Sequence, residues 1–310
     1  MYGRPRDIYG IYLGEGMDKI KIGTRRSALA VAQAEAVMRS IAEWDIRVPV
    51  ELVTIPTIQD QYPELAKEVD GRAPYVWELE KALADGVIDL SVHSLKDMAA
   101  KRNPLLPVCA VSQREDPRDV LVLPSGVGRL LKGRPLGCSS VCRRYQLGKL
   151  FPGIQLKMVP GDVLSRLDRL DNGEFSGMVM SAADLKTLGL ESRISRYFTA
   201  REMLPGCGQG FVAVQCRAGE RVGYLANYHN ADSWEISLAE LAFSQTLGGG
   251  HSSPATAHAW IDGGQMTIRG YTVDRQGEKI PGMFSGPVKR AQKLGVELAA
   301  YLQAEANERG

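Results

Sequence analysis

Residues 135–181, PLGCSSVCRRYQLGKLFPGIQLKMVPGDVLSRLDRLDNGEFSGMVMS, alternate short apolar runs with longer amphipathic ones. The apolar runs predict strands over 135–138, 154–159 and 177–181. Between them, helical patterns end at Leu150 and at the Asp171-Asn172-Gly173 turn. Strands that alternate with helices favour a parallel sheet with helices on both faces, so this stretch predicts a doubly wound α/β domain.

The same alternation continues on both sides of this stretch. The further strands that we expect cover residues 19–23, 48–54, 88–92 and 211–216, with a hairpin over 255–272. We also expect four further helices. One begins with Ser27 as its N-cap, and two cover 75–84 and 234–246. The last lies at the end of the chain and has on one face Val288, Ala291, Leu294, Leu298 and Leu302. Most of the chain is therefore expected to be α/β.

Composition and charge exclude several classes of protein. The 310 residues are 44% apolar and 24% charged, which suits a globular protein of about two domains rather than a disordered or fibrous chain. No apolar stretch approaches the roughly 18–20 residues of a membrane helix, so we expect no membrane association. The net charge of +2, from 38 basic and 36 acidic residues, gives no reason to expect nucleic acid as a partner.

The N-terminus and the cysteines both indicate the cytoplasm. Residues 1–17 lack periodicity and an apolar secretory core, so we interpret them as a flexible leader rather than a signal peptide. The cysteines number five, and Cys138 and Cys142 form a C-x3-C spacing without a second pair or nearby histidines. We therefore expect reduced thiols, no metal site and cytoplasmic localisation.

Arg, Ser, Lys and Asp gather in four segments at the ends of predicted strands. The segments are 24–27 (TRRS), 93–97 (HSLKD), 139–144 (SSVCRR) and 161–166 (GDVLSR). Three of them open a predicted helix, where free backbone N–H groups favour anions, and arginine grips carboxylates in a bidentate fork. Solvated surface arginines are the alternative, but four such segments at one end of a sheet favour a pocket for a small polyanion. Asp97 is an acid among cations; it either pairs with Lys96 or an arginine, or stabilises a developing cation.

Six stretches together resemble the porphobilinogen deaminase (hydroxymethylbilane synthase) family, from about Lys19 to the C-terminus. They are IGTRRSALAVAQA (22–34), DLSVHSLKD (89–97), REDPRDVLV (114–122), SSVCRRYQL (139–147), RLDRLDNGEFSGMVMSAADLKTLGL (166–190) and GCGQGFVAVQCR (206–217). None of these is a generic nucleotide, flavin or metal motif. The resemblance is therefore specific.

The resemblance implies a three-domain fold. Two domains similar to periplasmic binding proteins, 18–112 with 208–229 and 113–207, would face each other across a cleft. A small α+β domain, 230–310, would follow and carry the 247–254 loop. The family's mobile loop would correspond to the unpatterned segment 57–74.

The resemblance also implies a reaction and a set of site residues. The family deaminates porphobilinogen, a pyrrole with acetate, propionate and aminomethyl groups, and couples four units head to tail. Its aspartate that matches Asp97 assists loss of ammonia and stabilises the azafulvenium cation. The substrate-binding positions implied by the match are Arg25, Ser27, Ser94, Lys96, Ser139, Arg143, Arg144, Arg166 and Gln209.

The sequence departs from the family where the primer and the growing chain would bind. The family links a dipyrromethane cofactor to the cysteine of L-x-G-G-C-x-x-P, but residues 247–254 read LGGGHSSP, with His251 in the cysteine's place. Pro160 and Thr187 replace two family arginines, and the family's K-G-L-F becomes RAPY at 72–75. Because Asp97 and four arginines remain, these losses predict an altered function without covalent dipyrromethane.

Three hypotheses remain open. The first is an enzyme that activates porphobilinogen or a related pyrrole without a covalent primer and makes a short or different product. The second is a true hydroxymethylbilane synthase whose primer is attached to Cys138 or Cys207, and the third is a non-catalytic pyrrole-binding protein. His251 either acts as a general acid or base or fills space, and His93 is expected to be structural. We expect a monomer, and the physiological pyrrole and product length stay open.

Overall fold

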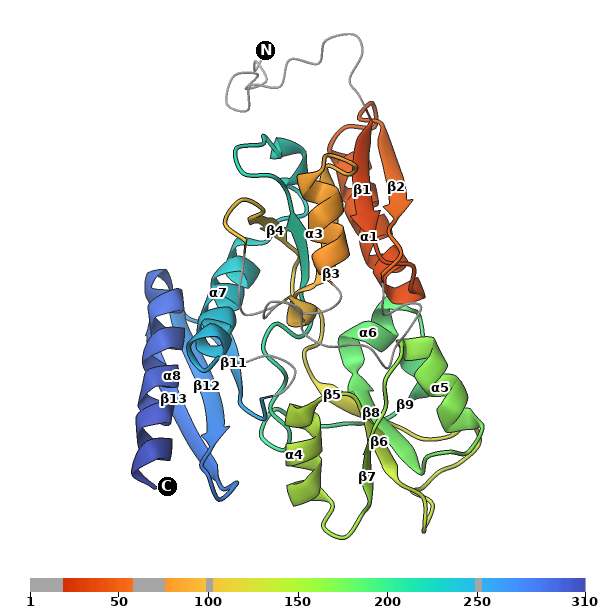
Figure 1. The fold of residues 1–310 in the computed structure, drawn as a ribbon, viewed down its shortest axis with the longest axis vertical. Helices are drawn as coiled ribbons and strands as arrows, with labels where there is room; N and C mark the ends of the chain where they lie inside the picture. The colour runs from red at the N-terminus through yellow and green to blue at the C-terminus, as the bar shows by residue number, and fades with distance from the viewer. Residues whose placement is uncertain (1–18, 58–75, 99–102, 249–252, 310) are drawn as a thin grey trace.

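The computed structural model describes residues 19–57, 76–98, 103–248 and 253–309, and these form three sheets with their helices (Figure 1). The expected leader 1–17, nearly all of the 57–74 segment and His251 lie outside the described residues. None of the helices in the described ranges combines the length and the apolarity needed to cross a bilayer.

The first unit, here called lobe 1, contains a mixed sheet in the order β2-β1-β3-β10-β4. Its strands are β1 (Ile20–Thr24), β2 (Val50–Thr54), β3 (Leu90–Ser94), β4 (Val108–Val111) and β10 (Val212–Gln215). Its helices are α1 (Ala28–Trp44) and α3 (Trp77–Ala84), with short 3-10 turns η2 (Leu95–Asp97) and η4 (Gly223–Leu225). Ser27 caps α1 by accepting a hydrogen bond from the Ala30 N–H, as the sequence predicted.

The second unit, here called lobe 2, repeats this architecture with the strand order β7-β6-β8-β5-β9. Its strands are β5 (Asp119–Val122), β6 (Leu136–Cys138), β7 (Leu156–Met158), β8 (Gly177–Ser181) and β9 (Ile194–Tyr197). Its helices are α4 (Val141–Leu150), α5 (Val163–Asp171) and α6 (Ala182–Thr187), with the 3-10 turn η3 (Glu191–Arg193). Thus the stretch 135–181 does form a doubly wound sheet.

The C-terminal unit is an antiparallel sheet covered by two helices. Its strands are β11 (Thr256–Asp262), β12 (Gln265–Val273) and β13 (Lys279–Pro287), and its helices are α7 (Ala231–Thr246) and α8 (Ala291–Glu308), preceded by η5 (Val288–Arg290). Gly263 and Gly264 turn the expected hairpin with φ of +55° and +76°, a conformation that glycine adopts readily. Helices α7 and α8 pack so closely that a Cβ on Gly295 would lie 2.1 Å from the Ala239 carbonyl oxygen.

One prediction about the sheets is wrong. The alternating pattern predicted parallel strands, but β10 runs antiparallel to β3 and β4, and β5 runs antiparallel to β8 and β9. Both exceptions follow a crossing of the chain between the lobes, from β4 to β5 and from β9 back to β10. A strand that enters a sheet from the other lobe runs against its neighbours, which local periodicity does not reveal. The proposed domain boundaries stay a prediction.

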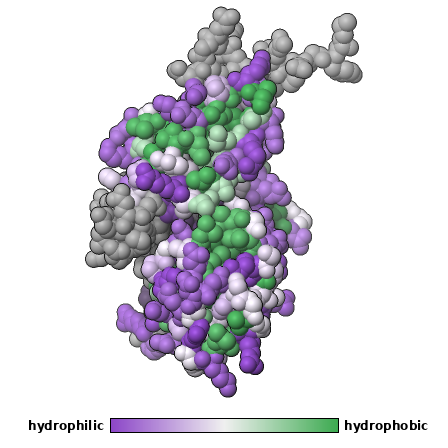
Figure 2. Space-filling view, turned by 90° about the vertical axis from the view of Figure 1, so that its right-hand side faces the viewer, coloured by the Kyte–Doolittle hydropathy of each residue, from purple (hydrophilic) through white to green (hydrophobic). Residues whose placement is uncertain are grey.

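The two lobes are in contact on one side of the molecule. Leu29, in the first turn of α1, packs against the apolar core of lobe 2, and α1 contacts α6. Figure 2 shows the side of the molecule on the right of Figure 1, where hydrophobic residues run down the middle between hydrophilic ones. The ends of β1 and β3 therefore lie close to lobe 2.

Candidate active site

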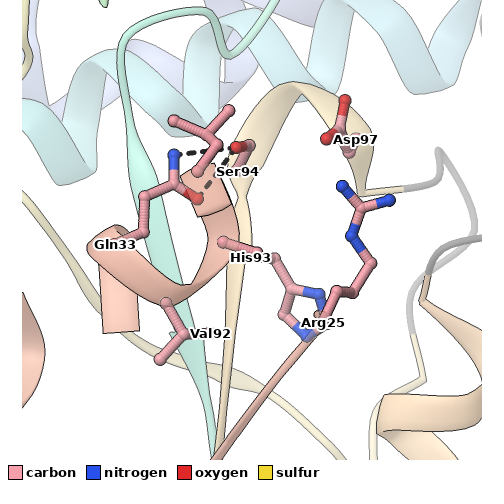
Figure 3. A pocket seen from close by; sticks show the side chains of 8 residues that line it. Arg25, Gln33, Val92, His93, Ser94 and Asp97 are labelled. Carbon is pink, nitrogen blue, oxygen red and sulfur yellow. Dashed lines mark hydrogen bonds between the residues drawn. The ribbon is translucent and has the colours of Figure 1, made fainter. Parts of the chain in front are cut away.

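A small pocket lies where the carboxyl ends of β1 and β3 meet the N-terminus of α1 (Figure 3). Parallel strands end at the same edge of a sheet, and ligands of open α/β sheets bind at that edge. The pocket is lined by Arg25, Leu29, Ala30, Gln33, Val92, His93, Ser94 and Asp97. Three predicted site residues, Arg25, Ser94 and Asp97, thus line one pocket, and Ser27 caps the helix beside it.

Arg25 and Asp97 lie at one end of this pocket. Arg25 follows β1 and Asp97 ends η2, and in Figure 3 the Arg25 guanidinium extends toward the Asp97 carboxylate. Both side chains are half-buried and both make polar interactions in the structure. Arg25 is a cation that can bind a ligand carboxylate, and Asp97 is a carboxylate that can stabilise a developing positive charge. The two therefore share one site.

Gln33 is a site residue that the sequence reasoning missed. Its Nε2 lies 2.9 Å and its Oε1 3.1 Å from the Ser94 hydroxyl, so that the two side chains join α1 to the end of β3. Gln33 is buried on the face of α1 that otherwise carries Ala30, Ala34, Val37 and Ile41. A buried polar residue in an apolar helical stripe needs a partner, and this was the signal in the sequence.

His93 is held in the neutral form beside the pocket. Its Nε2 lies 3.0 Å from the Ser91 hydroxyl, which donates to Gln215 Oε1 at 3.4 Å. Gln215 in turn donates to Glu80 Oε1 at 3.1 Å. Burial first, and then the Arg25 charge, together lower the pKa of His93 to about 4. A neutral imidazole within this buried series of hydrogen bonds fits the structural role expected for His93.

On the lobe 2 side, three predicted residues surround a buried carboxylate. Arg143 donates from Nε and Nη2 to Asp119 Oδ1 at 3.0 and 2.8 Å, and from Nη1 to the Ser139 hydroxyl at 2.8 Å. Gln209 accepts from Arg143 at 2.9 Å and donates to Asp119 at 2.8 Å. Burial works to lower the pKa of Arg143, but the attraction of Asp119 raises it. The charge of Arg143 is thus already balanced within the protein.

Arg144 lies in the first turn of α4, and Arg166 lies in the first turn of α5. Helix α4 is capped by Ser140, which accepts from the Arg143 N–H, and α5 is capped by Asp162. Arg144 is exposed, and within the described ranges its side chain forms no hydrogen bond or ion pair, whereas Arg166 is half-buried. Because anions are favoured at helix N-termini, Arg144 is well placed to receive a ligand carboxylate.

Lys96 contacts lobe 2 directly. Its ammonium group lies 2.8 and 2.5 Å from the two carboxylate oxygens of Asp184, in the first turn of α6. Both side chains are largely buried, at 20% and 14% exposed. Lys96 was expected to contact the substrate, and in this structure its partner is an acid of the protein itself.

Of the two cysteines considered as primer anchors, Cys138 is buried and Cys207 is half-buried. Cys207 donates to the Ala257 carbonyl at 3.4 Å and accepts from the Ala257 N–H at 3.2 Å, and burial raises the pKa of its thiol to about 12. Cys138 is 1% exposed, and burial raises its pKa as well. Nucleophilic attack requires the thiolate, so these two thiols do not fit covalent attachment of dipyrromethane. Within the described ranges there is also no cluster of His, Cys, Asp and Glu that could hold a metal ion.

Comparisons with known proteins identify the family of this chain. Residues 20–222 match the family described as "Porphobilinogen deaminase, dipyromethane cofactor binding domain". The porphobilinogen deaminase of Acetivibrio thermocellus is 43% identical over 91% of this chain and 97% of its own length. That of Alkaliphilus oremlandii is 41% identical over 94% of this chain and 99% of its own.

Among solved structures, the periplasmic VFT2 domain of BvgS from Bordetella pertussis matches with a TM-score of 0.41 and 13% identity. The match covers 67% of this chain and 85% of that domain. The family match, by contrast, covers most of both lobes, and the curated relatives align over nearly their whole length. The chain belongs to the porphobilinogen deaminase family, whose enzymes are transferases of the hydroxymethylbilane synthase type.

Proposed function

We propose that this protein activates porphobilinogen, or a closely related pyrrole, by loss of ammonia and couples it to an acceptor without covalent dipyrromethane. The observation that carries this proposal is the pocket in which Arg25 and Asp97 lie together at the ends of β1 and β3. The pocket offers a cation for a pyrrole carboxylate and a carboxylate for the cation that forms when ammonia leaves.

The chemistry follows from the charges. In the reaction, the bond between the aminomethyl carbon and its protonated nitrogen breaks. The bonding electron pair leaves with the nitrogen as neutral ammonia, and the positive charge remains on the pyrrole and spreads over its ring. A fixed carboxylate such as Asp97 stabilises that charge more than it stabilises the neutral ring, which lowers the barrier. Gln33 and Ser94 form hydrogen bonds with one another, which hold both side chains in the lining of the pocket.

The absence of a covalent primer is supported by three features. His251 stands where the family has its cysteine, and burial raises the thiol pKa values of Cys138 and of the half-buried Cys207. Thr187, in place of an arginine, donates its hydroxyl to the Ala183 carbonyl of its own helix at 2.9 Å. Pro160, in place of another arginine, offers neither charge nor N–H. We therefore infer a product shorter than or different from hydroxymethylbilane.

The remaining expectations about the cellular setting are part of this proposal. A net charge of +2 and the small pocket support a small carboxylated pyrrole as the partner, without nucleic acid or membrane. Free cysteines support a reducing compartment, and we infer a cytoplasmic monomer.

Two measurements on the purified full-length chain test the proposal. Intact mass spectrometry should give the mass of the sequence alone, and incubation with porphobilinogen should release ammonia. A mass increase of one dipyrrole, mapped to Cys138 or Cys207, would instead establish a hydroxymethylbilane synthase with a relocated primer. Binding of porphobilinogen without any ammonia release would establish a non-catalytic pyrrole-binding protein.

A further inference from the structure

The ion pair between Lys96 and Asp184 joins residues that are far apart in the sequence and belong to different lobes. Lys96 directly precedes Asp97 in η2, and Asp184 lies in the first turn of α6. Their contact distances of 2.8 and 2.5 Å leave no room for a ligand atom between them. The Lys96 ammonium is therefore already bound to an acid of the protein, immediately next to Asp97, the candidate catalytic carboxylate.

Asp184 also adds negative charge to a region that has lost positive charge. Three residues later in the chain, Thr187 stands where the family has an arginine, and Pro160 is a second such replacement. Burial opposes the ionised form of Arg143, but its pKa is raised by Asp119 first and also by the charge of Asp184. Asp184 thus lies near two cations, Lys96 and Arg143, that could otherwise serve a ligand carboxylate.

We propose that Asp184 is a specificity-determining residue that occupies Lys96, so that a ligand carboxylate can bind Lys96 only by displacing it. This inference rests on the proposed function for the identity of the ligand. A pyrrole with two carboxylates loses one of its potential partners, and each further ring of a growing chain would add two more carboxylates to an already depleted site. Asp184 therefore restricts the number of rings that the cleft holds.

The charge of Asp184 can be removed with little change in shape. Asp184→Asn keeps an oxygen that accepts a hydrogen bond from Lys96, and the packing of Leu29 against lobe 2 does not involve it. The lobes should stay together while the Lys96 ammonium becomes available to an anion. Asp168→Asn is the matched control, because Asp168 is an exposed acid of lobe 2 on α5 without an ion pair among the described residues.

The test is calorimetric titration of porphobilinogen into the wild type, Asp184→Asn, Asp168→Asn, Lys96→Gln and the double variant Lys96→Gln/Asp184→Asn. We expect Asp184→Asn to bind about tenfold more tightly, which corresponds to about 1.4 kcal/mol, and Asp168→Asn to bind within about twofold of the wild type. When Lys96 is already replaced by Gln, adding Asp184→Asn should no longer tighten binding, so the double variant should bind like Lys96→Gln alone. The reason is that Asp184 acts on binding through Lys96.

Several outcomes would overturn the inference. They are unchanged or weaker binding by Asp184→Asn, a gain that persists without Lys96, and an equal gain in Asp168→Asn. If the wild type binds no porphobilinogen, binding by Asp184→Asn supports the inference, and its failure to bind refutes it. Ammonia release, measured in parallel, decides the proposed function separately: tighter binding by Asp184→Asn without ammonia from any variant would leave this inference standing alone.

Discussion

Arg143 and Asp119 form an ion pair in lobe 2, with the Arg143 side chain 10% and the Asp119 side chain 1% exposed. The pair ties the start of α4 to the start of β5, next to one of the two crossings between the lobes. The neighbouring residue Arg144 is exposed. Two adjacent arginines of one motif therefore have different environments, and we expect them to have different roles.

Replacing Arg143 should destabilise the fold, whereas replacing Arg144 should not. Arg143→Met leaves the buried Asp119 without its cation, which costs about 3–5 kcal/mol of unfolding free energy. Arg144→Met removes an exposed charge and should change that free energy by less than about 0.5 kcal/mol while weakening porphobilinogen binding. Urea denaturation followed by circular dichroism measures both. Equal destabilisation by the two variants would contradict the structural role of Arg143.

Asp97→Asn should nearly abolish ammonia release from porphobilinogen while the fold is retained. The amide keeps the size of the carboxylate but lacks the charge that opposes the developing cation, a loss of about 10²- to 10³-fold in rate. Asp85→Asn is the control, since Asp85 is a half-exposed acid of the same lobe that pairs with Lys81 at the surface. Single-turnover ammonia assays report the rates, and an undiminished rate in Asp97→Asn would remove Asp97 from the mechanism.

His93 should make the protein less stable as the pH falls below 6.5. Unfolded His93 takes up a proton near pH 6.5, but folded His93 does so only at a pKa of about 4. The unfolded state therefore binds more protons in this window, and stability is lost as the pH falls through it. At 1.36 kcal/mol per pKa unit, the contribution is about 3 kcal/mol.

His93→Gln removes this titration and provides the comparison. Between pH of about 7 and about 4, the unfolding free energy of the wild type should fall by about 3 kcal/mol more than that of the variant. Urea denaturation at a series of pH values gives both curves, and the carboxylates shared by the two proteins cancel. Parallel curves would show that His93 is already charged, or is solvated, in the folded state.

Cys207 and Cys142 should resist alkylation in the folded protein. Burial raises their pKa values to about 12 and about 11, so that little thiolate is present at neutral pH. We expect iodoacetamide to modify both at least about 100-fold more slowly than an exposed cysteine, and to modify them readily in urea. Peptide mass mapping follows each site. Rapid alkylation of folded Cys207 would instead support a primer attached there.

His251→Cys alone should not restore efficient tetrapyrrole synthesis. A thiol at position 251 supplies a nucleophile, but the chain also needs cations for its carboxylates where Pro160 and Thr187 now stand. Hydrogen bonds to charged groups contribute roughly 1.5–3 kcal/mol each, so two missing arginines slow elongation by several powers of ten. The single variant is compared with a triple variant that adds Pro160→Arg and Thr187→Arg, with oxidised uroporphyrin as the readout. Abundant uroporphyrin from the single variant would refute the importance of the lost arginines.

Local features of this protein could be predicted from the sequence. The strand over 177–181 appears with the expected bounds as β8, and the other expected strands move by at most two residues at either end. Ser27 caps α1 as expected. These features depend on interactions within a few residues, such as side-chain periodicity and a hydroxyl bonded to a nearby N–H, so the sequence alone contains the relevant information.

The partners of the site residues were decided only by the tertiary structure. The motifs identified Lys96, Arg143 and Gln209, but not that Lys96 would face an acid 88 positions away or that Arg143 and Gln209 would share Asp119. The antiparallel direction of β5 and β10 escaped prediction for the same reason. The strand directions follow from the two crossings of the chain between the lobes. The charge pairs follow from the folded arrangement, because attraction between opposite charges depends on distance in space rather than on separation in the sequence.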